Sequence, residues 1–190
     1  MKKKIEELLL STGREGMANL LEYMGKQGFY SAPCSSQYHL CKVGGLAEHS
    51  MNVCDLMQKM YYSNDKFGIP YNIFSKNIKW GQIIITSLLH DLGKMGQYGK
   101  PNYVENILKS GKVSDSKPYT TNTELLSVPH EIRSIQIASQ FIELTEEESF
   151  AILYHNALYG DLKYQLNGKE RPLQTLLHFA DLWVSRFLEV

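Results

Sequence analysis

The 190-residue chain has little cysteine, no long apolar run and no excess of charge of either sign, and each shortage excludes a class of protein. Its three cysteines are odd in number and show no CxxC spacing, so neither a disulfide framework nor a cysteine-based zinc site is expected. We interpret them as small, buried or half-buried side chains in a reducing cytosol, and we expect a cytoplasmic protein. They are Cys34, Cys41 and Cys54.

No apolar run approaches the ~20 residues that a transmembrane helix needs, and we expect no membrane partner. The basic start, Met1 to Lys4, leads into an amphipathic helix and not into the apolar core of a signal peptide. The formal charge is zero, from 20 basic and 20 acidic residues, which argues against the large basic surface that binds long duplex nucleic acid. A small basic pocket around phosphates is still compatible with this balance.

The composition, with 43% hydrophobic residues, allows a sizeable core, and the length fits one domain. We expect an all-α, single-domain helical bundle with one or two small β-hairpins, because most apolar residues recur at helical spacing. Residues 1–37 would form N-terminal helices and a loop, and the core would span about residues 38–188.

The expected elements follow from this spacing and from capping and turn residues. The apolar helix over 78–92, which Gly93 would end, is apolar nearly all round and should be buried on most sides. The other expected helices cover 5–10, 17–24 and 44–60 and begin near Pro129, Thr145 and Pro172. The expected hairpins lie around 109–112, inside an irregular excursion over 96–122, and over 162–172.

The most informative stretch is Leu88-Leu89-His90-Asp91-Leu92-Gly93-Lys94, in which an apolar helix carries a histidine and an aspartate into the interior. Burying such groups is costly unless they are paired or bind a metal. Further His and Asp residues lie on or beside the apolar stripes of four other expected helices. Each has an ordinary structural explanation when taken singly, but together they favour a metal cluster in the bundle core. The candidate ligands are His49, His90, Asp91, His130, His155 and Asp181.

These ligands divide into two sets that share one carboxylate. The first set would be His49, His90, Asp91 and Asp181, and the second would be Asp91, His130 and His155. Two ions about 3.5–4 Å apart are what an in-line phosphoester displacement uses. The ligands mix nitrogen with oxygen and include no thiolate, which suits a divalent transition metal (Fe, Mn, Co, Ni or Zn) better than Ca. The identity of the metal, and occupancy by one ion or two, stay open.

Four further residues are candidates for the site, each with a structural alternative. Lys94 would bind a substrate phosphate or interact, as a cation near a helix C-terminus, with the helix dipole. Arg133 would contact phosphate from the face of a ligand-bearing helix or form a surface ion pair. His178 would orient a ligand, donate a proton or be structural, and His39 would reach the mouth of the pocket or be solvated.

The order of these motifs resembles that of the HD-domain superfamily of metal-dependent phosphohydrolases, over about residues 38–187. The resemblance rests on residues 44–50 (GGLAEHS), 89–94 (LHDLGK) and 178–181 (HFAD). The first of these is similar to the segment in bacterial HD-type 3′-5′ exoribonucleases. The resemblance implies that His49, His90, Asp91 and Asp181 are ligands, that His130 and His155 complete a two-metal site, and that Lys94 contacts phosphate.

The resemblance also narrows the substrate. The GYP signature of cyclic-di-GMP phosphodiesterases is absent, and the first ~40 residues are too few and too helical for the OB-fold barrel of the exoribonucleases. We therefore expect a phosphohydrolase that cleaves a nucleotide, a cyclic nucleotide or a short oligonucleotide by metal-activated water. Asp91 and Lys94 would be catalytic, and Lys94, Arg133 and His39 would contact substrate.

Two alternatives stay open from the sequence. The first is a catalytically weak nucleotide-binding or signalling module that keeps the metal site. The second is an HD-type oxygenase with a di-iron pair. For the phosphohydrolase and for the signalling module, the expected partner is a small nucleotide or oligonucleotide, and the sequence is compatible with an oligomer.

Overall fold

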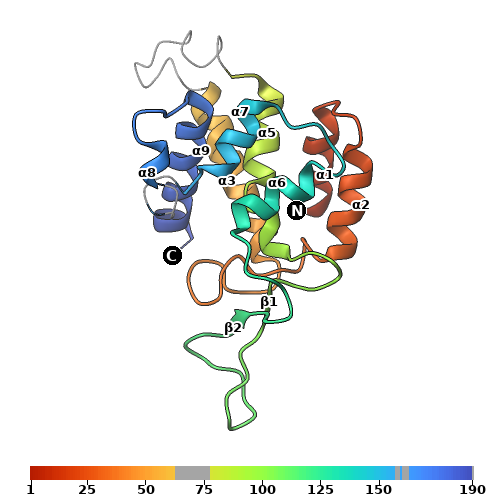
Figure 1. Cartoon of the computed structure of the whole chain (residues 1–190), viewed down its shortest axis with the longest axis vertical. Helices are drawn as coiled ribbons and strands as arrows, with labels where there is room; N and C mark the ends of the chain where they lie inside the picture. Colours follow the sequence, from red (N-terminus) through yellow and green to blue (C-terminus); the bar gives the residue numbers. More distant parts are fainter. Residues whose placement is uncertain (63–77, 157–158, 160–162, 190) are drawn as a thin grey trace.

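A computed structural model describes residues 1–62, 78–156, 159 and 163–189, and it is mainly helical with one small antiparallel sheet (Figure 1). The all-α expectation is therefore confirmed. The helices are α1 (Lys2–Ser11), α2 (Met17–Gln27), α3 (Gly45–Tyr62), α5 (Trp80–Leu89), α6 (His130–Ala138), α7 (Glu146–Leu153), α8 (Lys163–Leu166) and α9 (Pro172–Trp183). The described residues also form a 3-10 turn η1 (Leu92–Met95), a π-helical turn η2 (Val184–Leu188) and strands β1 (Tyr103–Glu105) and β2 (Tyr119–Thr121). No helix in the described ranges has both the length and the apolar character needed to cross a membrane.

Helix α5 is the centre of the core, as its apolar sequence predicts. Ile83, Ile84, Ile85, Leu88 and Leu89 are fully buried, and the helix contacts α1, α3, α7 and α9. A buried side chain of this size contributes about 1.5–3 kcal/mol relative to an exposed one. This apolar helix is thus covered by four others, and the residues at its C-terminal end are buried.

Two helix starts form as the sequence predicts. Thr145 caps α7 with a capping box, in which its hydroxyl accepts from the Glu148 amide at 3.2 Å and the Glu148 carboxylate accepts from the Thr145 amide at 2.8 Å. Pro172 occupies the first turn of α9, where its missing N–H costs nothing. The fully buried Glu148 also pairs with Arg14 at 2.8 Å, which joins α7 to the segment between α1 and α2.

The end of α5 differs from the expectation. The helix stops at Leu89 with His90 as its C-cap, and Asp91 leaves the helical region at φ −101° and ψ 11° before η1 begins. Gly93 therefore does not end α5. A Cβ at Gly93 would lie 2.4 Å from the His130 carbonyl oxygen, so glycine is required here by the close approach of η1 to α6. The Gly93 amide also donates to the Ser134 hydroxyl at 2.8 Å.

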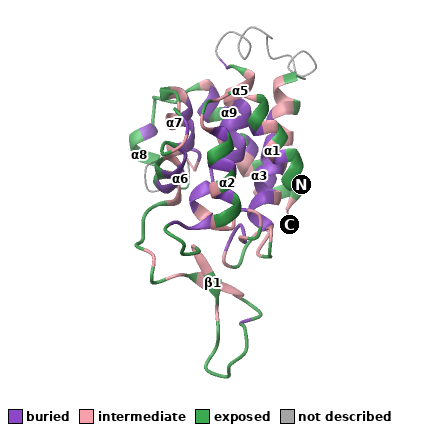
Figure 2. Cartoon of the chain, turned by 90° about the vertical axis from the view of Figure 1, so that its right-hand side faces the viewer, coloured by how far each residue is buried: buried purple, intermediate pink, exposed green. Residues whose placement is uncertain are grey.

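The excursion over 96–122 forms a hairpin arm that projects from the helical body (Figures 1 and 2). Tyr103 pairs with Thr121 and Glu105 with Tyr119, and a further bridge lies nearer the tip. The expected turn near residues 109–112 is confirmed, because the Leu108 amide donates to the Lys112 carbonyl at 2.8 Å.

The second expected hairpin, over 162–172, is wrong. The described part of this segment forms the short helix α8, and residues 160–162 lie outside the described residues. Leu166 is buried at the end of α8, and Gly168 takes a positive φ of 75° just after it. The Asn167-Gly168 pair therefore ends a helical turn that anchors an apolar side chain, and it does not join two strands.

Candidate metal centre

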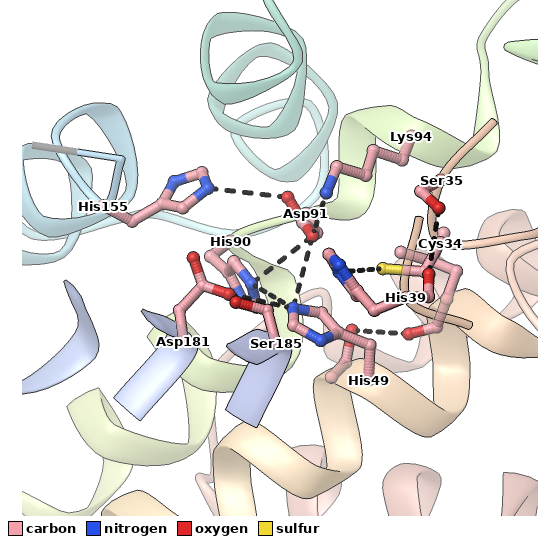
Figure 3. Close-up of polar contacts among 12 residues, drawn as sticks. Cys34, Ser35, His39, His49, His90, Asp91, Lys94, His155, Asp181 and Ser185 are labelled. Carbon is pink, nitrogen blue, oxygen red and sulfur yellow. Dashed lines mark hydrogen bonds and ion pairs between the residues drawn. The ribbon is translucent and has the colours of Figure 1, made fainter. Parts of the chain in front are cut away.

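The candidate ligands come from five separate segments and lie close together. Figure 3 shows five of them, namely His49, His90, Asp91, His155 and Asp181. Three of the candidate ligands lie within helices, namely His49 in α3, His130 at the start of α6 and Asp181 in α9. The other three were expected on helices but lie at or just beyond helix ends. His90 caps α5, Asp91 precedes η1, and His155 follows the C-cap of α7. The regular hydrogen bonds of a helix stop at its ends, so the backbone at these positions can turn toward the centre.

One half of the centre gathers two imidazoles and two carboxylates. His49 Nε2 lies 3.1 Å from Asp181 Oδ1 and 3.6 Å from Asp91 Oδ2. His90 Nε2 lies 3.3 Å from His49 Nε2 and 3.5 Å from Asp91 Oδ2. Both histidines are fully buried and Asp91 nearly so. The donor atoms of His49, His90 and Asp91 lie close to one another, and Asp181 forms a similar group with His90 and His155.

The other half is built on the second oxygen of Asp91. His130 Nε2 lies 3.2 Å and His155 Nε2 lies 3.5 Å from Asp91 Oδ1. The two imidazole Nε2 atoms are 3.4 Å apart. Asp91 therefore turns one oxygen toward each set of histidines.

The protons on two of the rings are fixed by backbone carbonyls. His90 Nδ1 contacts the Ser87 carbonyl at 2.8 Å, and His155 Nδ1 contacts the Ile152 carbonyl at 2.8 Å. A carbonyl oxygen only accepts, so each Nδ1 carries its proton. In the neutral imidazoles the Nε2 lone pair then faces the centre, as ligand histidines require.

Carboxylates hold the other two rings, and neither was predicted from the sequence. Glu189 Oε2 accepts from His49 Nδ1 at 2.9 Å, and its other oxygen accepts from the Asn52 amide at 2.9 Å. Glu131 Oε2 lies 3.4 Å from His130 Nδ1. Glu131 follows His130 directly, which was an available signal. Glu189 comes after the π-helical η2, so regular helical spacing from α9 does not locate it.

Burial and charge shift the titration of the cluster. Burial lowers the pKa of His90 to about 4. Burial also lowers the pKa of His49, but Cys34 and the neighbouring carboxylates together raise it well above its ordinary value. Burial raises the pKa of Asp91, but attraction to Lys94 and the surrounding imidazoles brings it well below the usual range. The pKa of His155 is raised, because its bond and attraction to Asp91 outweigh burial.

The donors present fit a divalent cation. Asp91 Oδ1 is buried and has only the imidazoles of His130 and His155, at 3.2 and 3.5 Å, as polar neighbours among the described residues, without a well-formed hydrogen bond to either. A buried oxygen without a good hydrogen bond is costly. His90 presents a bare Nε2 near the Asp91 carboxylate, because its Nδ1 carries the proton and burial keeps its pKa low. Neutral imidazole nitrogen and carboxylate oxygen are ligands of transition metals. The buried groups could therefore hold a metal ion.

The remaining candidates fall into different places. Lys94 Nζ lies 2.6 Å from Asp91 Oδ2 and lines the cavity beside the centre. His39 also lines this cavity, and its ring centroid is 5.1 Å from that of His49. Arg133 is buried elsewhere, because its guanidinium donates to Gln97 at 2.9 Å and to a backbone carbonyl at 2.7 Å. It is therefore not brought to the cluster.

His39 also contacts Cys34, with its Nε2 3.4 Å from the thiol sulfur. Cys34, His39 and His49 form a further group of close donor atoms. Burial raises the pKa of the Cys34 thiol to about 11. The thiol therefore stays protonated near neutral pH in the metal-free chain. Because the thiolate and not the thiol binds metals, this disfavours Cys34 as a ligand.

The cavity beside the centre has a volume of about 770 Å³. Lys94, Asp181, His178 and Glu189 are among the residues that line it. His178 donates from Nδ1 to the His155 carbonyl at 2.7 Å, so it contacts the backbone of a candidate ligand. Such a volume lies in the range of small-molecule sites.

We found no match to this chain among models of protein families, curated protein sequences or solved structures. Its function is therefore inferred from the geometry of the centre and the adjoining cavity. The chain folds as a helical protein with a buried His and Asp cluster that could bind metal, consistent with an HD-type site.

Proposed function

We propose that the chain is a metal-dependent phosphohydrolase that cleaves a nucleotide phosphoester. The observation that carries the proposal is the position of Asp91, which turns one oxygen to His130 and His155 and the other to His49 and His90. A carboxylate shared by two histidine sets suits a pair of ions rather than one. The motif resemblance to the HD superfamily supports the same reaction.

The two sets of donors divide the roles in metal binding. His49, His90 and Asp181 would hold one ion, His130 and His155 the other, and Asp91 would bridge them. When bound, such a pair supplies a hydroxide nucleophile at neutral pH and polarises the phosphoryl oxygens. The mixed nitrogen and oxygen ligands favour Fe, Mn, Co, Ni or Zn.

The side chains around the cavity have their own tasks. Lys94 lines the cavity with an ammonium group beside Asp91, where it would bind the oxygens of a substrate phosphate. Burial lowers the pKa of Lys94, but attraction to Asp91 and other groups raises it above its ordinary value. Lys94 is therefore charged at all physiological pH values, and it fits a role in anion binding. We assign no phosphate contact to Arg133, because Gln97 and a backbone carbonyl take up its guanidinium.

The test combines metal analysis with a substrate screen. The purified chain is analysed for metal and then assayed with nucleotides, cyclic nucleotides and short oligonucleotides in the presence of Mn, Ni, Co or Fe. Asp91→Ala should lose turnover and the second equivalent of metal while keeping its helical circular dichroism. The control is Asp55→Ala, which removes an exposed aspartate that pairs with Lys4 on the surface. Full activity in Asp91→Ala would contradict the proposal.

The same experiment separates the alternatives. Tight nucleotide binding without turnover for any phosphoester would favour a signalling module. Oxygen consumption by an iron-loaded chain would favour an oxygenase. Either result would replace the phosphohydrolase proposal.

A further inference from the structure

The outer part of the cavity carries two exposed aromatic rings. Tyr38 and Tyr159 both line the cavity and are 73% and 66% exposed. Exposed tyrosines are ordinary on protein surfaces, but these two flank a hollow that leads to the candidate metal centre. Each offers a flat apolar face to whatever enters the mouth.

Each ring is connected through neighbouring residues to a different half of the centre. Tyr38 precedes His39, whose ring packs 5.1 Å from that of His49. The Tyr159 amide donates to the Asn156 carbonyl at 2.7 Å, and the Asn156 side chain lies 3.3 Å from His130 Nε2. A ligand that contacts these rings would therefore be held at a fixed position relative to the buried donors.

A guanidinium group completes the mouth. Arg186 lines the cavity and lies over the Tyr159 ring, 5.9 Å from its centroid. Within the described part of the chain, no carboxylate forms an ion pair with Arg186. Arg171, by contrast, pairs with Glu147. A guanidinium stacked on an aromatic ring offers a second planar, cationic surface for an aromatic ligand.

We propose that this mouth, formed by Tyr38, Tyr159 and Arg186, binds the base of a nucleotide whose phosphate reaches the metal centre. The inference rests on the proposed function and names the part of the substrate that the centre does not contact. A phosphate alone would leave most of a 770 Å³ cavity empty, whereas planar rings and a guanidinium that pairs with no carboxylate of the described residues match a nucleobase. Stacking accepts any base, so the mouth distinguishes nucleotides from sugar phosphates rather than one base from another.

The test uses binding as well as turnover. Calorimetry on the Mn-loaded chain compares the four nucleoside 5′-monophosphates with ribose 5-phosphate. Stacking on an aromatic side chain corresponds to about 5- to 150-fold in affinity, so the nucleotides should bind more tightly than ribose 5-phosphate by about this factor. Tyr159→Ala and Arg186→Gln should remove most of the advantage and leave the affinity for ribose 5-phosphate unchanged. Arg186→Lys should restore little, because lysine keeps the charge but not the planar surface.

The chain offers matched controls. Tyr164 is 83% exposed and has Lys163 over its ring at 5.2 Å, but it does not line the cavity. Tyr164→Ala and Arg171→Gln should therefore change no affinity. Equal binding of nucleotides and ribose 5-phosphate, or equal losses for both in Tyr159→Ala, would overturn the inference.

Failure of this inference and failure of the proposed function give different results. Hydrolysis of phosphoesters without any preference for nucleotides over sugar phosphates would refute the base-binding mouth and leave the proposed function intact. If the chain hydrolyses no phosphoester but binds nucleotides through the base, and Tyr159→Ala abolishes this binding, the proposed function is refuted and the base-binding mouth stands.

Discussion

Replacing Glu189 by glutamine removes the charge of the carboxylate that accepts from His49 Nδ1 and changes the side-chain volume very little. The Glu189 side chain is 1% exposed, accepts from His49 Nδ1 at 2.9 Å and accepts from Asn52 at 2.9 Å. Glutamine keeps one carbonyl oxygen that can still accept from the imidazole. The substitution therefore removes the charge and also replaces the oxygen that accepts from Asn52 by an amide NH2, to which Asn52 can adapt by turning its own oxygen toward it.

The size of the effect follows from the change in the hydrogen bond. A bond to a charged group contributes about 1.5–3 kcal/mol and a neutral one about 0.5–1.5 kcal/mol. The difference of about 1–1.5 kcal/mol corresponds to roughly tenfold in metal affinity. This agrees with the loss of about 10- to 100-fold seen when the partner of a ligand histidine is removed. We expect Glu189→Gln to weaken metal binding in the His49 half by about tenfold.

Titration calorimetry with Mn²⁺, together with the absorbance of the Co²⁺-loaded chain, measures the two binding events separately. Glu131→Gln is the comparison, because Glu131 supports His130 at the longer distance of 3.4 Å. It should weaken the other event, and by less. Glu7→Gln, at an exposed position of α1, is the neutral control. Unchanged affinity for both ions in Glu189→Gln would refute the reasoning.

Three further predictions concern pH and packing. Metal binding should release protons and strengthen as the pH rises through neutrality, because the raised pKa values of His49 and His155 keep these rings protonated in the metal-free chain; calorimetry in buffers of different ionisation enthalpy measures the release. Glu148→Ala should lower the free energy of unfolding in urea by about 3 kcal/mol, because it leaves the Arg14 guanidinium without its buried partner. Gly93→Ala should cost about 1–3 kcal/mol in the same assay, since its Cβ would lie 2.4 Å from a backbone oxygen of α6.

Each of these has a result that would count against it. Metal affinity that is independent of pH between about 6 and 8 would mean that the rings are neutral before metal binds. A stable Glu148→Ala variant would show that the capping box and the ion pair contribute little to α7. Gly93→Ala with wild-type stability would mean that η1 and α6 can move apart freely.

The helical framework could be predicted because its signals are local. The spacing of apolar residues located α5, and the N-cap residue Thr145 and the proline at Pro172 marked two helix starts. The convergence of the six candidate ligands was also predictable in outline. Buried charged groups need partners, and each of these residues lay beside an apolar stripe.

Other features depend on contacts that are distant in sequence. The end of α5 at Leu89 depends on how closely η1 packs on α6 around Gly93. Arg133 shares a helix with His130, yet Gln97 and Leu126 decide where its guanidinium lies. Glu189, which contacts His49, follows η2, where the helical repeat departs from that of an α-helix. Spacing along the chain carries no information on any of these three.

The hairpin arm has a mechanical link to the mouth of the cavity. At its base the Tyr119 amide donates to the Ser36 carbonyl at 3.2 Å, and Ser36 lies two residues before Tyr38. A protein that bound the tip of the arm would therefore displace or immobilise the short segment that carries Tyr38. Substrate affinity would then depend on binding at the tip, without any change in the buried donors.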